Sequence, residues 1–325
     1  MLLILSEDGD ISSYKVSKWL NYYNVNHVII SEKTKINNLN VILGNDLTSI
    51  TFNLNNKQYS LSQFNSFWFR RGEFNYEHPK LDIEFINEEV ISHLNFELVM
   101  LINFIHFNLE NKAKTIGSIF KANSNKLLDL QMAVKSGFKI PRTFIVDSKN
   151  DLKKLLGTKT TSFITKGIAR PIQFTITKDK ESYKFKSLTN QLDFDLNKLG
   201  VFFFPSLVQE EIIKKYEIRI FFFESFLWAM CIFSQKNPKT SIDFRNYDRE
   251  NPNRCVPYSL PEDVIKKLNK FIRLTNLSTG SIDLIKTNNN DYVFLEVNPD
   301  GQFDFVSHDC NYYIERKIAE YYASE

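Results

Sequence analysis

The sequence predicts an α/β protein with about two to three domains, and three observations indicate this class. First, a strand pattern at 2–5, a helix pattern at 13–23 and a strand pattern at 25–30 form an α/β unit within about 30 residues. Second, strand and helix patterns alternate again after residue 124. Third, the 325 residues are 43% hydrophobic and 24% charged, which is typical of a folded globular protein.

The composition excludes several other classes. The 10 glycines are too few for a collagen-like or glycine-linker architecture. The 41 basic and 38 acidic side chains give a net charge of +3, which predicts no strong nonspecific affinity for nucleic acid. The three cysteines are far apart in the sequence, so we expect neither a disulfide framework nor a structural zinc site, and a reducing cytoplasm fits best.

No membrane contact is expected either. The first residues have no basic leader, and their apolar run is too short for a signal peptide. The most apolar window, 98–109, is interrupted by Asn103 and His106 and is shorter than the about 20 residues that span a bilayer.

The pattern of the first region predicts that residues 1–115 form one domain. A hairpin is expected at 51–61 because two asparagines interrupt its apolar pattern. A strand follows at 67–69, and a long helical pattern occupies 81–108.

The second region begins with a helix whose first turn contains Lys126. Ser124 is the expected N-cap, Gly137 ends the helix and Pro141 marks the stop. The elements expected next are strands at 142–146, 162–168, 174–177, 207–212, 217–223 and 227–233, helices at 148–156 and 261–274, an antiparallel strand pair at 280–286 and 292–298, and a last helix at 310–322. Neither the dinucleotide-binding glycine fingerprint nor the P-loop occurs anywhere in the sequence.

The strongest chemical signal is a pair of carboxylates within two apolar strand patterns. Because side chains alternate along a strand, Tyr292, Phe294, Glu296 and Asn298 should share one face, and two largely apolar faces predict a central strand. Asp283 has similar surroundings on the partner strand. An uncompensated buried carboxylate is costly, whereas two carboxylates and an amide oxygen suit Mg²⁺ with a nucleotide. The alternative is a pair of edge strands with exposed acids.

Two lysines occupy positions where a bound anion would be stabilising. Lys126 lies in the first turn of its helix, where the helix dipole disfavours a cation. Lys166 shares a strand face with Ile164 and Ile168, so it needs a partner or extends its amine to water. The alternative for each is a solvated surface lysine.

Two acid–arginine pairs follow. Glu217 and Arg219 share a strand face, and one alternative is a simple surface ion pair. The three phenylalanines that follow argue against a wholly exposed strand. Asp243 and Arg245 lie in a polar loop that either faces solvent or holds an anionic substrate.

Taken in order, these residues resemble the ATP-grasp superfamily over roughly 115–310. The positions similar to its nucleotide lysines, its adenine-reading hinge and its ribose-binding acid are Lys126, Lys166, Gln209, Glu210, Ile213 and Glu217. The positions similar to its magnesium triad are Asp283, Glu296 and Asn298. One departure is that Lys166 is followed by a single glycine where many members carry a glycine-rich phosphate loop, and Arg170 is a candidate to replace some of those contacts.

Within the superfamily, the sequence is most similar to the ATP-grasp peptide maturases of the microviridin (graspetide) type, including the grasp-with-spasm branch. The resemblance rests on a tryptophan–arginine motif at 67–71, an E-x-R strand at 217–219 and a D-x-R loop at 243–245. It implies that the catalytic residues are Arg219 and Arg245, and that the substrate contacts are Arg70, Arg71 and Asp243.

The resemblance implies an ATP-grasp fold: an α/β pre-ATP-grasp domain at 1–115 and two α+β subdomains, at 116–205 and 206–325, that clamp ATP. The implied enzyme uses ATP and Mg²⁺ to activate Asp or Glu side chains of a ribosomal precursor peptide, leader plus core, as acyl phosphates. A hydroxyl or amine of the same peptide then closes an ester or amide macrocycle. Neither nucleic acid nor membrane is an expected partner, and the choice between monomer and homodimer stays open.

Two rival functions also stay open. A glutamate-ligase-like enzyme that adds an amino acid to a protein or small-molecule acceptor would use the same ATP residues. A nucleotide-binding regulatory protein without turnover would not need the metal ligands.

Overall fold

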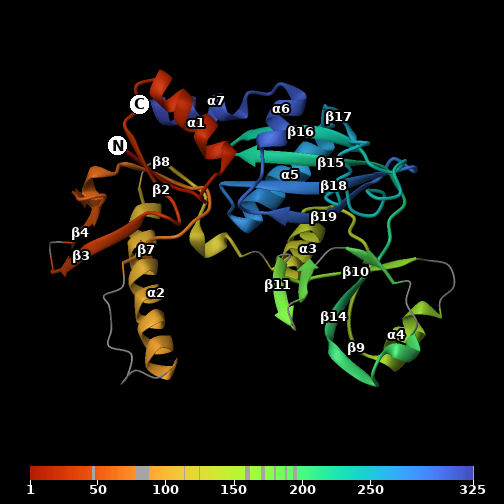
Figure 1. Cartoon of the computed structure of the whole chain (residues 1–325). Coiled ribbons are helices and arrows are strands. Elements are labelled where there is room, and N and C mark those ends of the chain that lie inside the picture. The colour runs from red at the N-terminus through yellow and green to blue at the C-terminus, as the bar shows by residue number, and fades with distance from the viewer. Residues whose placement is uncertain are drawn as a thin grey trace. The chain divides into compact units, whose positions relative to one another are not determined.

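The computed structural model describes residues 1–45, 48–77, 88–112, 114–123, 125–157, 162–169, 173–178, 181–186, 189–192 and 196–324. Two compact units emerge (Figure 1). Unit 1 comprises Met1–Ala122, Gln302–His308 and Tyr312–Glu325, and unit 2 comprises Asn123–Gly301 and Asp309–Asn311.

Unit 1 contains two sheets that share one apolar core. The parallel sheet has the order β2 (His27–Ile30), β1 (Leu2–Leu5), β6 (Ser66–Phe69) and β8 (Lys114–Ile116). The second sheet has the order β5 (Lys57–Ser60), β4 (Thr48–Leu54), β3 (Lys35–Leu43) and β7 (Asn75–Tyr76). Helix α1 (Ile11–Tyr22) links the first two strands, as predicted. The predicted hairpin is also confirmed, since Asn55 and Asn56 turn it with φ values of 51° and 60°.

The chain ends in two helices rather than in the single helix predicted at 310–322. These are α6 (Asp304–Cys310) and α7 (Ile314–Ala323). The helix is interrupted because Asn311 and Tyr313 adopt the left-handed conformation, with φ values of 53° and 52°.

The C-terminal segments belong to unit 1. The Tyr322 hydroxyl, near the end of α7, donates a hydrogen bond of 2.9 Å to the carbonyl oxygen of Phe67 in β6. Residues 302–308 and 312–324 therefore belong to unit 1, together with the N-terminal sheets. The three-part division itself stays a prediction.

Helix α2 (Glu88–Glu110) occupies most of the helical pattern predicted at 81–108, of which 81–87 lie outside the described residues. Its buried residues all lie in the C-terminal third: Ile102, Ile105, His106 and Leu109. By length and composition alone, α2 is long and apolar enough to cross a bilayer, a test that core helices of soluble proteins also pass. The predicted apolar window at 98–109 was therefore too short.

The first part of unit 2 is a four-stranded sheet with α4 (Lys149–Leu156) on one face. The strand order is β13 (Asn190–Gln191), β10 (Phe163–Lys166), β14 (Phe202–Glu210) and β9 (Thr143–Ser148), and a separate hairpin consists of β11 (Gln173–Lys178) and β12 (Glu181–Lys186). Leu152, Phe163 and Val208 form the core under α4. Since side chains alternate along β10 and β14, Lys166 and Gln209 lie on the opposite face.

The second part of unit 2 is an antiparallel sheet. The strand order is β17 (Arg254–Pro257), β16 (Phe226–Phe233), β15 (Lys214–Phe223), β18 (Thr279–Thr287) and β19 (Tyr292–Asn298). Helices α3 (Lys126–Lys135) and α5 (Glu262–Thr275) pack on one face, against Ile218, Ile220 and Phe294 among others. The opposite face of β15 and β18 carries the polar side chains Glu217, Arg219 and Asp283 beside buried apolar ones such as Phe221.

Strand β19 differs from the prediction in two ways. It is an edge strand of its sheet and not a central one. Its pairing with β18 also shifts, because Asp283 pairs with Glu296 whereas the next residue of β18 pairs with Phe294. Leu295 is therefore the extra residue of a β-bulge, so Phe294 enters the core while Leu295 and Glu296 both line a pocket. The prediction that Phe294 and Glu296 share one face was wrong.

Helix α3 begins at Lys126, as predicted, but its N-cap is Asn125. The Asn125 side chain accepts hydrogen bonds from the backbone N–H groups of Leu127 and Leu128. Ser124, the predicted N-cap, lies outside the described residues. Strands β3, β7, β8, β12, β13 and β17 were not predicted, and short 3-10 helices lie at Leu61–Gln63, Ile119–Lys121 and Leu196–Lys198.

Candidate active site

A pocket of ≈ 670 Å³, partly open to solvent, lies between the two sheets of unit 2. Its wall includes residues of β10, β14, β15, β18 and β19 and of the loop between β16 and β17. Charged side chains gather around Glu296, and we call this the charged part. The residues around Gln209 and Glu217 form the hinge part, next to the connection from β14 to β15.

Glu296 is central to the charged part. Its Oε1 accepts a hydrogen bond of 3.0 Å from Arg245, and its Oε2 lies 3.6 Å from the amine of Lys126. Lys126 also donates to the carbonyl oxygen of Gly167 at 2.8 Å, just after β10. Lys166 is close enough to interact electrostatically with both Glu296 and Lys126. The structure thus brings together two lysines and a carboxylate that are far apart in the sequence.

Arg219, Asp283 and Glu296 lie side by side across β15, β18 and β19. Arg219 pairs with Asp283 in one ladder, and Asp283 pairs with Glu296 in the next. The Arg219 guanidinium donates a hydrogen bond of 2.7 Å to Asp283 Oδ2, and both side chains are buried. A buried carboxylate needs such a counter-charge, which explains the buried arginine between Ile218 and Ile220.

Burial perturbs the charges of this cluster. It raises the pKa of Asp283, because low-dielectric surroundings disfavour the charged carboxylate and Arg219 opposes this only in part. Burial would also raise the pKa of Glu296, but Arg245 and the two lysines outweigh it and hold that pKa below its usual value. The pKa of Lys166 is lowered by burial, against the attraction of Glu296.

Two carboxylate oxygens in the charged part suit a divalent cation. Asp283 Oδ1 and Glu296 Oε2 are buried and make no hydrogen bond within the described residues. Such an acceptor costs about 1–3 kcal/mol unless a partner arrives, and Mg²⁺ prefers oxygen ligands. Within the same described part, no three or more His, Cys, Asp or Glu side chains form a group that could hold a metal. These two oxygens would therefore share the ion with water or phosphate oxygens.

The structure gives less support to Asn298 as a metal ligand than to the other two members of the predicted triad. It follows Glu296 by two positions on β19, opposite Ser281. Its side-chain oxygen accepts the backbone N–H of Asp300 at 3.2 Å. Among the described residues, Asp283 and Glu296 line the pocket but Asn298 does not.

In the hinge part, Gln209 is fully buried in the pocket wall. Its Nε2 donates a hydrogen bond of 2.8 Å to the hydroxyl of Thr143, which itself donates to the carbonyl oxygen of Pro141 at 2.9 Å. This chain fixes which end of the amide carries the N–H groups. Gln209 Oε1 then remains a buried acceptor without a hydrogen bond in the described part of the chain.

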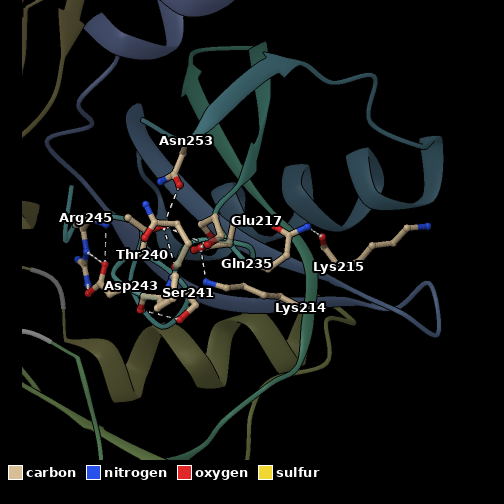
Figure 2. A network of polar contacts seen from close by, with 12 residues as sticks. Lys214, Lys215, Glu217, Gln235, Thr240, Ser241, Asp243, Arg245 and Asn253 are labelled. Carbon is tan, nitrogen blue, oxygen red and sulfur yellow. Dashed lines mark hydrogen bonds and ion pairs between the residues drawn. The ribbon is translucent and has the colours of Figure 1, made fainter. Parts of the chain in front are cut away.

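Glu217 is held by two neighbours in the hinge part (Figure 2). Its Oε1 lies 2.5 Å from the amine of Lys214 and 2.6 Å from the hydroxyl of Ser234. Burial raises the pKa of Glu217, while Lys214 and Ser234 act in the opposite direction. The predicted hinge residue Glu210 also lines the pocket, whereas the side chain of Ile213 is exposed and absent from the pocket wall as described.

Arg245 is positioned by Asp243 in the loop between β16 and β17 (Figure 2). Two guanidinium nitrogens donate to the two Asp243 oxygens at 2.8 Å each, and this pairing contributes to a pKa of Asp243 lowered to about 2 despite burial. The loop is anchored by Thr240, whose hydroxyl hydrogen-bonds to Ser234 O at 3.1 Å and to Asn253 Oδ1 at 2.9 Å. Asp243 therefore fixes the guanidinium so that it reaches Glu296.

Arg70 and Arg71 lie in unit 1. Arg70 is buried and pairs with Asp10, the N-cap of α1, at 3.4 Å. Arg71 pairs with Glu7 at 3.3 Å. These ion pairs stabilise the loop after β1, so both arginines have a structural role. Their role as substrate contacts stays a prediction. Arg170 lies outside the described residues.

Sequence reasoning missed Lys214 and Thr143. Lys214 lies three residues before Glu217 and is the counter-charge that a buried acid requires, so the buried strand pattern itself was a usable signal. Thr143 carried no signal, because its role depends on the pairing of β9 with β14.

Comparison with known proteins supports the fold. No family model matches the sequence, and no curated protein matches it. Solved structures match nearly the whole chain, and three of them illustrate the likeness. The macrocyclase MdnC of Microcystis aeruginosa, solved with the precursor peptide MdnA, is 23% identical, with a TM-score of 0.79 over 100% of this chain and 99% of that one. A RiPP-associated ATP-grasp ligase of Chryseobacterium gregarium, solved with ADP and a leader and core peptide, is 22% identical, with a TM-score of 0.76 over 99% and 95%.

The third structure is the ATP-grasp ligase PsnB, solved with a minimal precursor, Mg and ADP. It is 15% identical, with a TM-score of 0.70 over 99% of this chain and 96% of that one. The predicted α/β ATP-grasp fold is therefore confirmed over the full length of the chain.

Proposed function

We propose that the protein is an ATP- and Mg²⁺-dependent ligase that forms ester or amide macrocycles in a ribosomal precursor peptide of the microviridin type. The observation that carries the proposal is the charged part of the pocket. There Lys126, Lys166, Arg219 and Arg245 surround two carboxylates, each of which has a buried oxygen without a hydrogen bond in the described structure. The solved structures with this fold include peptide macrocyclases and ligases crystallised with precursor peptides and ADP.

The residues of the charged part would neutralise a triphosphate. Bound ATP would supply the γ-phosphoryl group that turns a substrate carboxylate into an acyl phosphate, and Mg²⁺ would offset the charge of the phosphates. A hydroxyl or amine of the peptide would then displace the phosphate. Lys126 and Lys166 would offset the phosphate charge, and phosphoryl transfer depends mainly on such positioning and electrostatics. Asp283 and Glu296 would hold the ion through the buried oxygens that make no hydrogen bond within the described residues.

The two arginines would act on the substrate carbonyl. Arg245 is held on one edge by Asp243 and directs its remaining nitrogen toward Glu296. Arg219 is fixed by Asp283. Preorganised donors of this kind stabilise a developing oxyanion by about 3–4 kcal/mol each. We further propose a cytoplasmic location, because a reducing compartment suits the three free cysteines.

Mass spectrometry with ATP, Mg²⁺ and candidate precursor peptides tests this proposal. We expect the loss of one water per ring, and Lys166→Met should abolish the loss while the exposed control Lys153→Met retains it. A gain in mass equal to an added amino acid would instead identify a glutamate-ligase-like enzyme. Binding of MgADP without phosphate release for any peptide would point to a regulatory protein.

A further inference from the structure

The loop between β16 and β17 is long for a connection between two paired antiparallel strands. It occupies residues 234–253, whereas most such connections have about 2–5 residues. Long loops without secondary structure of their own are usually functional. In this loop, the segment 241–245 lines the pocket of unit 2 and contains Asp243 and Arg245. The contacts that fix this segment therefore decide where the Arg245 guanidinium lies.

Thr240 closes the base of this loop (Figure 2). Its side chain is fully buried. Its hydroxyl lies 3.1 Å from the carbonyl oxygen of Ser234, the first residue of the loop, and 2.9 Å from Oδ1 of Asn253, the last one. A valine would fill nearly the same volume without burying a polar group. The hydroxyl therefore serves its hydrogen bonds and not the packing.

Ser234 extends this connection to strand β15. Its hydroxyl donates a hydrogen bond of 2.6 Å to Glu217 Oε1, and its carbonyl oxygen accepts one from Thr240. Ser234 is also fully buried, so water does not compete for these bonds. Glu217 lies two residues before Arg219 on the same face of β15. Glu217, Ser234 and Thr240 thus form one buried path from β15 to the loop that carries Arg245.

This path relates the two arginines that would act on the substrate carbonyl. Arg219 is fixed on β15 by Asp283. Arg245 is fixed within its loop by Asp243. Neither ion pair connects the loop to β15, so neither sets the distance between the two guanidinium groups. The path through Thr240 does connect them, and it does not involve the hydrogen bonds that the arginines would offer to a substrate.

We propose that Thr240 is a positioning residue for Arg245, which it holds through Ser234 at the distance from Arg219 that the reaction requires. The inference rests on the proposed function, since that function gives both arginines a role at the substrate carbonyl. A misplacement of about 1 Å can cost about 100-fold in rate. Loss of the Thr240 hydroxyl should therefore slow the chemical step. It should leave nucleotide binding unchanged, because the two nucleotide lysines lie on other elements.

Steady-state kinetics of the full chain test the proposal on a peptide that the wild type cyclises, with water loss followed by mass spectrometry. Thr240→Val should lower kcat by about 10- to 100-fold, while KM for ATP stays within about twofold. Thr240→Ser keeps the hydroxyl and should restore most of the rate. Should Thr240→Val not fold, Ser234→Ala cuts the same path at its other end and should lower kcat by a similar factor.

The matched control is Thr279→Val. The Thr279 hydroxyl is also buried and also donates to a backbone carbonyl oxygen at 3.1 Å, that of Phe222. This variant should lose about as much thermal stability as Thr240→Val but keep the kcat of the wild type. An equal loss of kcat in both variants would show a merely structural effect and would overturn the proposal.

Amide hydrogen exchange without peptide tests the connection itself. Exchange in the segment 241–247 should be at least about 10-fold faster in Thr240→Val than in the wild type, and unchanged in Thr279→Val. Unchanged exchange in Thr240→Val, a wild-type kcat in that variant, or a Thr240→Ser variant that is equally slow would each overturn the proposal. A wild type that cyclises no peptide would instead reject the proposed function, and exchange would still decide whether Thr240 holds the loop.

Discussion

Gln209 gives the sharpest prediction about the nucleotide. Its Oε1 is a buried acceptor in the pocket wall, and the Thr143 hydroxyl fixes the amide so that this oxygen, and not the nitrogen, is left unpaired. Adenine carries an exocyclic amine that donates hydrogen bonds, whereas guanine carries a carbonyl oxygen at the same ring position. The proposed ligase should therefore select adenine through Gln209, and Gln209→Leu should lose the selection.

The magnitude follows from the unpaired acceptor. A buried polar atom without a partner costs about 1–3 kcal/mol, which a bound adenine would relieve. The variant has no acceptor to satisfy, so its affinity for MgADP should fall by about 5- to 150-fold. Removal of Gln209 Oε1 also removes its repulsion with a guanine carbonyl oxygen, so the affinity of the variant for MgGDP should stay the same or rise. The ligand-free variant should differ little in stability from the wild type, because the hydrogen bond that it loses to Thr143 is offset by the unsatisfied Oε1 that it no longer buries.

Isothermal titration calorimetry with MgADP and MgGDP measures both affinities, and thermal unfolding measures the stability of the ligand-free protein. Gln131→Leu on α3 is the matched control, since its side chain is exposed. An unchanged ratio of the two affinities in Gln209→Leu would refute the assignment. A loss of stability without ligand well above the about 1 kcal/mol of the lost Thr143 hydrogen bond would show that Oε1 has a partner within the protein, and this too would refute the assignment.

Three further outcomes are expected. Glu296→Gln should bind ADP equally with and without Mg²⁺ in calorimetry, because an amide replaces one of the two carboxylates that have a buried oxygen without a hydrogen bond in the described structure, and a persisting Mg²⁺ dependence would reject Glu296 as a ligand. Arg219→Met should lower the free energy of unfolding by about 3–5 kcal/mol in urea titration, because Asp283 stays buried without its counter-charge, and adding Asp283→Asn should restore part of it. His106 is buried among aromatic rings with a pKa lowered to about 4 by burial, so the unfolded chain takes up a proton that the folded one does not, and stability should fall from pH 6.5 toward pH 4. His106→Leu should remove up to about 3 kcal/mol of that pH-dependent loss, and an unchanged slope would show that His106 is protonated in the folded protein.

Much of the site follows from the sequence because buried charge is rare. A carboxylate, an arginine or a lysine inside an apolar strand pattern is costly unless it has a partner, so the sequence pattern alone indicates Asp283, Glu296, Arg219 and Lys166. These residues come together only because distant segments pair as strands, and the sequence pattern of one segment does not show which strand it pairs with. For the same reason Thr143 was missed, since only the β9–β14 ladder brings it to Gln209.

Local strand patterns failed where tertiary context decides. The bulge at Leu295 breaks the two-residue period of β19, and without it Glu296 and Phe294 would share a face. One face would then carry both a core aromatic ring and a charged ligand. The extra residue resolves this conflict by sending Phe294 to the core and Glu296 to the pocket. Bulges beside functional sites commonly redirect a side chain in this way.

The ion pairs of the charged part also predict the order in which metal, nucleotide and peptide bind. Without a metal, Glu296 is neutralised by Lys126 and Arg245, the same cations that phosphate and substrate would need. A divalent ion on Glu296 would take over that neutralisation and release both cations. Lys126 would then be available to the phosphates, while Arg245 would keep its orientation through Asp243 and turn its remaining nitrogen to the substrate carboxylate. Metal and nucleotide should therefore bind together, and the acidic peptide should bind more tightly after them than before.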